Sequence, residues 1–201
     1  MTVSVSAQAD PRDFQFDLAA KPRPAPAPLA ERIHKAAWKA APAAASLRGG
    51  APEDAIRLVV IHATAGASTE GAVSVIREGR ASFHWIVPGE GEAGHGAFVW
   101  ATCPEALAAW HVRRSCAHPD VCAGATNLNR LSLGIEIVNR QNGADPFSDW
   151  QVSAAAAIVR YAAAKYPKLV HVTSHARLDP QRRRDPGSDF PWEDFMRRVM
   201  A

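Results

Sequence analysis

Three side chains of the types that bind transition metals stand in contexts that suit a single site. His62 ends the apolar run 58–61, and His175 follows the apolar stretch 169–173. Asp185 comes after three arginines and directly before a Pro-Gly turn. Two imidazoles and a carboxylate can hold a zinc ion and leave a fourth position for water. The chain therefore carries the parts of a hydrolytic zinc site, in which Asp185 is either a ligand or an ion-pair partner of the neighbouring arginines.

A fourth residue of interest, Glu136, interrupts the apolar run 133–138. Successive side chains of a strand point to opposite faces, so Glu136 faces away from Ile135 and Ile137. If that face is open to solvent, the carboxylate is simply hydrated. If it is buried, an unpaired carboxylate is costly and a functional reason is expected. In that case Glu136 would be a general base with a raised pKa, beside the water that the metal activates.

The elements that must position these residues alternate between strands and helices. Apolar, β-branched runs predict buried strands at 56–61, 83–87, 98–102, 133–138 and 169–173. Cap residues predict helices from Ser68 to near Gly79 and from Ser148 to before Pro167. A last helix is expected over Trp192–Met200. This alternation predicts an α/β fold with a mixed central β-sheet flanked by helices. Both histidines would then lie at the carboxyl ends of strands, where such sheets tend to place sites.

The composition of the chain changes near residue 54. Residues 21–28 are rich in proline and should be extended. A short helix is expected over 29–39, followed by a Gly/Pro linker over 46–54. We therefore predict a basic N-terminal extension and linker at 1–54 and a monomeric catalytic domain at 55–201.

The length and composition are those of an ordinary globular protein. Of the 201 residues, 47% are hydrophobic and 21% are charged, and no apolar stretch approaches the ~20 residues that span a bilayer. The first eight residues lack the basic head and apolar core of a secretory signal. We therefore expect a protein that is cytoplasmic as synthesised and that would need another route for any export.

The net charge of +3 is mildly basic. The densest clusters, Arg113-Arg114 and Arg182–Arg184, are either solvated surface or a site of attraction to a polyanion. No nucleic-acid-binding signature is present, so nucleic acid is not an expected partner. An anionic bacterial wall fits the charge equally well.

Three cysteines cannot all pair within one chain. Cys116 and Cys122 could close a small disulfide loop, or bind a second metal with His118, although their spacing matches no zinc signature. Reduced, structural cysteines, Cys103 included, are the default expectation in a cytosolic protein.

Six motifs, in order, give the chain a family resemblance from about residue 55 to 195. The motifs are Val59-Val60-Ile61-His62, Ser82-Phe83-His84-Trp85-Ile86-Val87, Ala109-Trp110-His111, Ser132-Leu133-Gly134-Ile135-Glu136, Ser174-His175-Ala176-Arg177-Leu178-Asp179-Pro180 and Asp185-Pro186-Gly187 through Phe190-Pro191-Trp192. Together they resemble the zinc-dependent N-acetylmuramoyl-L-alanine amidases of the type 2 amidase family, whose fold is shared with peptidoglycan recognition proteins. This resemblance implies the fold of that group.

The resemblance also implies a reaction. Zn²⁺ would be held by His62, His175 and Asp185, and Glu136 would pass a proton from water to the leaving amine. The bond cut would join the lactyl group of N-acetylmuramic acid to L-alanine in peptidoglycan or muropeptides. A module that binds muropeptides without cutting them is the alternative, but such modules typically lose a ligand. A third possibility is a zinc hydrolase for other acyl-amino-acid amides.

Two positions depart from the family pattern. Arg183 stands where the family usually has a lysine that stabilises the oxyanion; arginine can supply charge and a forked donor but not easily a proton. Alternatively, Arg183 only forms a surface pair with Asp179 or Asp189. Phe83 stands where some relatives carry a tyrosine with a catalytic hydroxyl, so more of the work would fall on Glu136.

The other family-like positions are expected to contact substrate or to be structural. Those expected to line the groove are His84, His111 and Trp110. Those expected on the surface or in loops are His34, His95, His118 and His171. The resemblance leaves two biological settings open. One is a cytosolic recycling enzyme. The other, slightly favoured by the proline-rich extension, is a phage-type endolysin that acts on the periplasmic cell wall after release through a membrane lesion.

Overall fold

The computed structural model describes residues 9–19, 22–94 and 98–201. The first eight residues, on which the expectation about a secretory signal rests, and His95 lie outside this part. The strands are β1 (Gln15–Asp17), β2 (Glu31–Ile33), β3 (Ala45–Leu47), β4 (Leu58–Ala63), β5 (Trp85–Val87), β6 (Val99–Ala101), β7 (Leu107–Ala109), β8 (Ser132–Ile137) and β9 (His171–Ser174). The α-helices are α1 (Lys35–Ala40), α2 (Pro52–Ala55), α3 (Thr69–Arg77), α4 (Asp149–Lys165), α5 (His175–Leu178) and α6 (Trp192–Met200).

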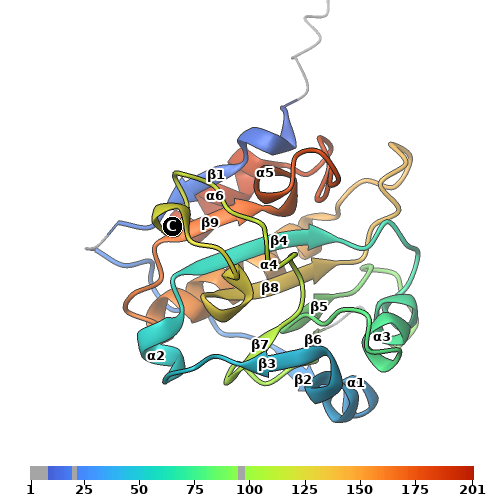
Figure 1. Cartoon of the computed structure of the whole chain (residues 1–201). Helices are drawn as coiled ribbons and strands as arrows, with labels where there is room; N and C mark the ends of the chain where they lie inside the picture. Colours follow the sequence, from blue (N-terminus) through green and yellow to red (C-terminus); the bar gives the residue numbers. More distant parts are fainter. Residues whose placement is uncertain (1–8, 20–21, 95–97) are drawn as a thin grey trace, which may run out of the picture.

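A seven-stranded mixed sheet forms the centre of the molecule (Figure 1). Its strand order is β1-β9-β4-β8-β5-β6-β2. The four middle strands, β9, β4, β8 and β5, run parallel, while β1 and β6 each run antiparallel to a neighbour. The strands β3 and β7 form a separate antiparallel pair. The predicted mixed sheet flanked by helices is confirmed.

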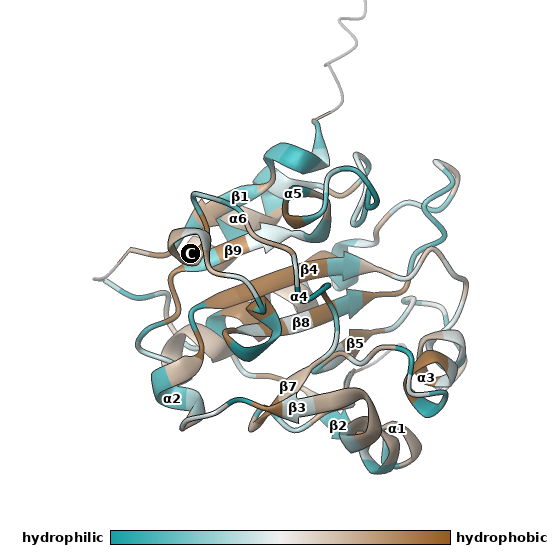
Figure 2. Cartoon of the chain, viewed as in Figure 1, coloured by the Kyte–Doolittle hydropathy of each residue, from teal (hydrophilic) through white to brown (hydrophobic). Residues whose placement is uncertain are grey.

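The two faces of the sheet are covered differently. On one face, Val59 and Ile61 of β4 and Ile135 of β8 pack with α4 and α6 in the main core. Because side chains alternate along a strand, Leu58, Val60 and His62 face the opposite side. There, Leu58 and Val60 pack under the loop that joins β7 to β8. Strands buried on both faces read as continuous apolar runs, which explains the brown colour of β4 and β8 in Figure 2.

The amino-terminal part differs from the sequence-based expectation. The helix predicted over 29–39 is strand β2 followed by α1, which begins where the ring of His34 accepts a hydrogen bond from the amide of Ala37. The predicted linker over 46–54 contains most of β3 and the start of α2. Within the described residues, the part before residue 54 supplies both edge strands of the main sheet. The domain division at residue 54 stays a prediction.

Strand β1 is fixed by both its backbone and its side chains. It pairs with β9, and the ring of Phe14, just before it, stacks on Trp192 of α6 at a centroid distance of 4.9 Å. The hydroxyl of Ser174 donates to the carbonyl of Pro11, and the amide of Ser174 donates to that of Phe14. The segment therefore holds the end of β9, from which His175 follows.

Two further features follow from the described residues. None of their helices has both the length and the apolar character needed to cross a bilayer. The thiols of Cys103, Cys116 and Cys122 are all free, so the pairing of Cys116 with Cys122 that the spacing left open does not occur. Burial raises the pKa of Cys103 to about 12, which leaves it a protonated thiol at neutral pH.

Phe14→Ala tests how much the amino-terminal segment contributes to the fold. Phe14 is only 3% exposed, and truncating a buried Phe typically costs about 3–5 kcal/mol of unfolding free energy. Leu47→Ala, at a position 76% exposed, is the control and should change it by less than about 0.5 kcal/mol. Urea unfolding measures both. Equal stability of the two variants would show that residues before β2 are a dispensable extension.

Candidate active site

The carboxyl ends of three parallel strands bring the candidate site together. In the register of β4 with β8, His62 lies directly opposite Glu136. His175 is the first residue of α5, which follows β9 without a break. The hydroxyl of Ser174 accepts a hydrogen bond from the amide of Arg177 and so caps this short helix. Sheet pairing and one helix cap therefore fix three of the four groups.

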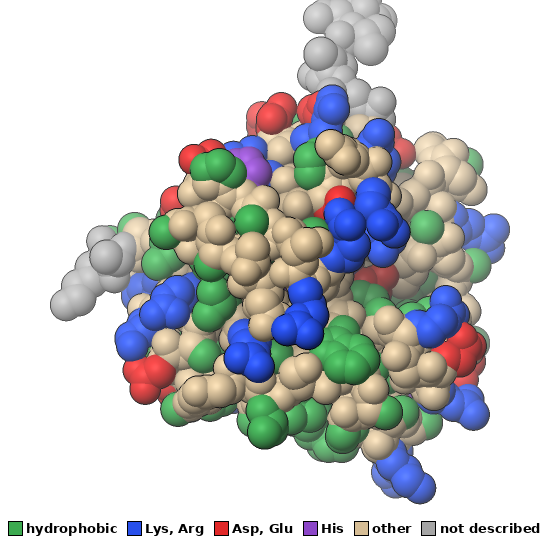
Figure 3. Space-filling model, viewed as in Figure 1, with side chains coloured by type: hydrophobic (Ala, Val, Ile, Leu, Met, Phe, Trp, Pro, Cys, Tyr) green, Lys and Arg blue, Asp and Glu red, His purple; other side chains and the backbone are tan. Residues whose placement is uncertain are grey.

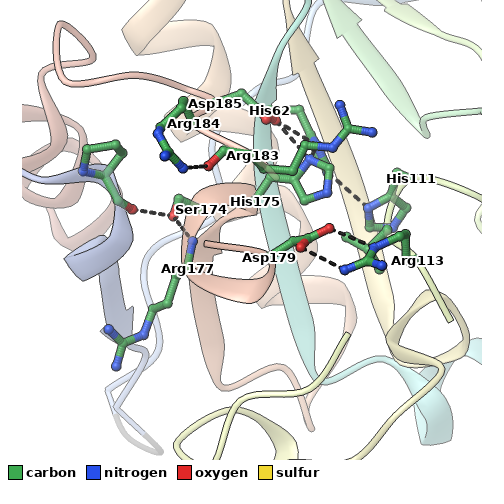
Figure 4. A network of polar contacts seen from close by, with 12 residues as sticks. His62, His111, Arg113, Ser174, His175, Arg177, Asp179, Arg183, Arg184 and Asp185 are labelled. Carbon is green, nitrogen blue, oxygen red and sulfur yellow. Dashed lines mark hydrogen bonds and ion pairs between the residues drawn. The ribbon is translucent and has the colours of Figure 1, made fainter. Parts of the chain in front are cut away.

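His62, His175 and Asp185 converge on one point (Figure 4). The two Nδ1 atoms are 3.0 Å apart, and Oδ2 of Asp185 lies 3.2 Å from Nδ1 of His62 and 3.0 Å from Nδ1 of His175. Ligands at the usual ~2.0 Å from a tetrahedral zinc ion are about 3.3 Å apart. The observed separations are close to that edge length, and two nitrogens with one carboxylate oxygen are donors that zinc accepts. The three residues thus fit a zinc ion.

The loop that carries Asp185 is tied to α5. The amide of Ala176 donates to the backbone carbonyl of Asp185. Gly187, with φ of +88°, then turns the chain back, and its amide donates to the backbone carbonyl of Arg184. Burial opposes ionisation of the Asp185 carboxyl, but the close contacts of its Oδ2 with the imidazoles of His175 and His62 outweigh it and hold its pKa well below the usual value. Asp185 therefore directs its carboxylate at the two imidazoles. This is the orientation that a metal ligand needs, the first of the two alternatives given for Asp185.

Glu136 is buried, with 5% of its surface exposed. Desolvation is the main reason that its pKa lies well above the ordinary value; the nearby Asp185 carboxylate raises it further, whereas Arg183 opposes the rise. Of the two alternatives left open for Glu136, the structure therefore shows the buried carboxylate and not the hydrated one on an open face. A buried carboxylate of raised basicity beside three metal-type ligands has the properties of a general base.

The imidazoles of His62 and His111 are also desolvated. Burial, followed by the proximity of His175, lowers the pKa of His62 to about 4. Burial also lowers the pKa of His111, whose Nδ1 lies 3.0 Å from Nε2 of His62. Phe83 packs edge-on against the His62 ring at a centroid distance of 5.7 Å. Both imidazoles are therefore neutral near pH 7, the state in which a histidine binds a metal.

These groups open onto a cleft of about 650 Å³. Its lining includes Glu136, Phe83 and the whole run Arg182–Arg184. A second cleft, of about 510 Å³, shares His111, His175 and Arg183 with it and is lined by Trp110, which is 40% exposed. Figure 3 shows basic side chains on both sides of a hollow on this face. An anionic ligand suits these surroundings.

Arg183 and Asp179 do not form the surface pair that was one alternative for Arg183. The carboxylate of Asp179 accepts two hydrogen bonds of 2.8 Å from Arg113, while only the backbone amide of Arg183 contacts Asp179, through its carbonyl. The side chain of Arg183 is exposed and lines both clefts.

His84 does not line the groove, contrary to the expectation from the sequence. Its ring is fully buried, accepts a hydrogen bond from the amide of Gly134 through Nδ1, and lies 3.1 Å from the carbonyl of Leu107. The buried Arg48 adds a contact of 2.9 Å. His84 is thus part of the support beneath β8. Trp110 stays at the mouth of the second cleft, where Nε1 donates to the hydroxyl of Ser46.

Comparison with known proteins agrees with this geometry. The family model described as N-acetylmuramoyl-L-alanine amidase matches residues 52–188. The chain is 34% identical over 149 residues to N-acetylmuramoyl-L-alanine amidase AmiD of Escherichia coli K12, covering 70% of this chain and 52% of that protein. It is 31% identical over 90 residues to 1,6-anhydro-N-acetylmuramyl-L-alanine amidase AmpD of Enterobacter cloacae, covering 43% of each. The chain thus spans about half the length of these curated relatives.

A solved structure gives the same result. The complex of Escherichia coli AmiD with anhydro-N-acetylmuramic acid-L-Ala-D-γ-Glu-L-Lys superposes with a TM-score of 0.59 at 28% identity, covering 76% of this chain and 60% of that one. Since the family model covers more than half of its residues, the chain belongs to the N-acetylmuramoyl-L-alanine amidase family.

Proposed function

We propose that this protein is a zinc-dependent hydrolase that cleaves the amide bond between N-acetylmuramic acid and L-alanine. The observation that carries the proposal is the convergence of two imidazoles and a carboxylate within 3.2 Å of one another, beside a buried glutamate of raised pKa. Family membership supports the same reaction.

The roles of the residues follow from their positions. His62, His175 and Asp185 would hold the ion, which when bound supplies Lewis-acid polarisation of the scissile carbonyl and a water of lowered pKa. Glu136 accepts a proton as the water attacks, and its raised pKa suits it to deliver that proton to the leaving amine. Because Phe83 carries no hydroxyl, Glu136 has no phenolic partner at that position.

Arg183 would stabilise the oxyanion. It lines the cleft and lowers the pKa of Glu136 through its charge, so its guanidinium acts on the same space in which the tetrahedral oxygen would develop charge. Its role would be electrostatic and hydrogen-bonding, because a guanidinium does not give up its proton near neutral pH.

The substrate we propose is peptidoglycan or a soluble muropeptide, bound by a monomer. The AmiD complex contains a muropeptide with a carboxylate-bearing stem peptide, and the arginines that line both clefts here suit such an anion. Trp110 offers an apolar ring at the mouth of the second cleft, where a sugar face can pack. Recycling of soluble muropeptides and lysis of intact wall are separated by activity on each substrate.

The proposed ligand set predicts the metal content. The purified protein should hold about one zinc ion per chain, because one set of three donors converges. His175→Ala removes a donor and should lower bound zinc severalfold in elemental analysis, whereas His171→Ala, whose ring pairs with Asp17 away from the site, should not. Undiminished zinc in His175→Ala would exclude this ligand set.

Glu136→Gln tests the general base. The amide keeps the shape of the side chain but cannot accept the proton, and loss of a general base typically lowers the rate by about 10²–10⁴-fold. Zinc content should be unchanged, and the exposed Glu70→Gln should keep full activity. If Glu136→Gln releases peptide from sacculi at a near-normal rate, another group is the base.

Arg183→Ala tests the oxyanion role. Loss of one oxyanion donor typically lowers kcat by roughly 10²–10³-fold, so a loss of that order is expected while zinc stays bound. Arg183→Lys should recover much of the activity because it restores the positive charge. The matched control Arg182→Ala, next to it in the same cleft, should mainly raise KM. Near-native kcat in both Arg183 variants would leave that residue without a catalytic role.

A further inference from the structure

A chain of three hydrogen bonds runs from the metal site into the interior. Nε2 of His62 lies 3.0 Å from Nδ1 of His111, and Nε2 of His111 lies 2.9 Å from the hydroxyl of Ser132. That hydroxyl in turn lies 2.8 Å from the backbone carbonyl of Leu128. All the side chains in this chain are buried.

The far end of the chain fixes the direction of every bond. The carbonyl of Leu128 can only accept, so the single hydroxyl proton of Ser132 must lie between the two oxygens. The hydroxyl then accepts from His111, whose proton is on Nε2. A neutral imidazole carries one N–H, so Nδ1 of His111 is an acceptor and His62 must donate to it from Nε2. The remaining lone pair of His62 is on Nδ1, the atom that faces His175 and Asp185.

We propose that His111 and Ser132 are positioning residues that fix the tautomer and the ring orientation of His62, so that its Nδ1 lone pair is presented to the metal before the metal arrives. The inference rests on the metal-binding role proposed above for His62. Hydrogen bonds to the outer nitrogen of a ligand histidine are known to set its tautomer and to raise its basicity.

The surroundings hold His111 in place for this role. Its ring lies against Gly134, where an added Cβ would come within 2.7 Å of the ring carbon Cγ. The side-chain oxygen of Asn129 accepts from the amides of His111 and Val112, and the Asn129 amide group donates to the carbonyl of Val112. Ser132, Gly134 and Glu136 alternate along β8 and so share one face. Ser132 supplies the hydroxyl, Gly134 leaves room for the His111 ring because it has no Cβ, and Glu136 is the proposed base.

His175 has no comparable support. Its Nε2 is buried and has no hydrogen-bond partner within the described residues, and its position comes instead from the start of α5. The two ligand histidines are therefore held by different means, and of the two only His62 depends on the hydrogen-bond chain through His111 and Ser132.

Two substitutions at His111 separate this role from simple packing. His111→Phe keeps a ring of similar size but offers no acceptor, and it should weaken zinc binding by roughly 10–100-fold, the usual effect of losing such a partner. His111→Asn is smaller, but its side-chain oxygen lies near the position of Nδ1 and should recover much of the affinity. Competition with a chromogenic chelator measures the zinc affinity. The control His171→Asn removes an imidazole that pairs with Asp17 away from the site, and should keep wild-type affinity.

Nitrogen-15 spectra of the histidine rings give a second, independent test on the wild-type protein with and without zinc. The expected result is His111 protonated on Nε2 alone in both forms, with His62 carrying its proton on Nε2. Because neither measurement uses substrate, the positioning role of His111 and Ser132 can be confirmed even if the amidase activity is absent. Protonation of His111 on Nδ1, or tighter zinc binding by His111→Phe than by His111→Asn, would overturn the proposal. If His111→Phe does not fold, the spectra of the wild-type protein decide alone.

Discussion

Desolvation of polar groups at the carboxyl ends of β4, β8 and β9 is the constraint on which the site depends. Two imidazoles and two carboxylates lie almost completely buried within a small volume. Burying such groups is unfavourable unless hydrogen bonds or a cation compensate. The same burial keeps His62 neutral and raises the basicity of Glu136. Desolvation therefore gives both the ligand and the base the protonation properties that they need.

The rest of the fold can be understood as support for this arrangement. The parallel register sets His62 opposite Glu136, and the helices α4 and α6 cover the other face of the sheet with apolar packing. The amino-terminal segment holds β9 and the start of α5 through Phe14 and Ser174. The polar face is closed by the loop after β7, which brings His111 behind the site. The parallel strands, the amino-terminal segment and the loop after β7 thus each contribute to the position of a functional group.

Much of this could be predicted from the sequence, for physical reasons. The buried strands of a parallel sheet and the capped helices have strong local signals, so β4, β8, α4 and α6 were expected close to where they lie. Glu136 stood out because a carboxylate is unusual in an apolar run. The segment 29–54 was misassigned, because its short strands are stabilised by pairing with β6 and β7, contacts remote in sequence. His84 was expected in the groove but is buried, because a motif predicts which residue stands at a position and not how far it lies below the surface. Ser132 and Gly134 could have been noticed, since they share the face of Glu136 at a spacing of two.

The most direct test of the central claim is mass spectrometry of the products formed from anhydro-N-acetylmuramyl tripeptide in water enriched in oxygen-18. Hydrolysis at the proposed bond gives free tripeptide without label and anhydro-N-acetylmuramic acid with one heavy oxygen in its lactyl carboxylate. Failure of the zinc-loaded protein to cut either this muropeptide or intact sacculi after prolonged incubation, or label at any peptide bond within the stem, would contradict it.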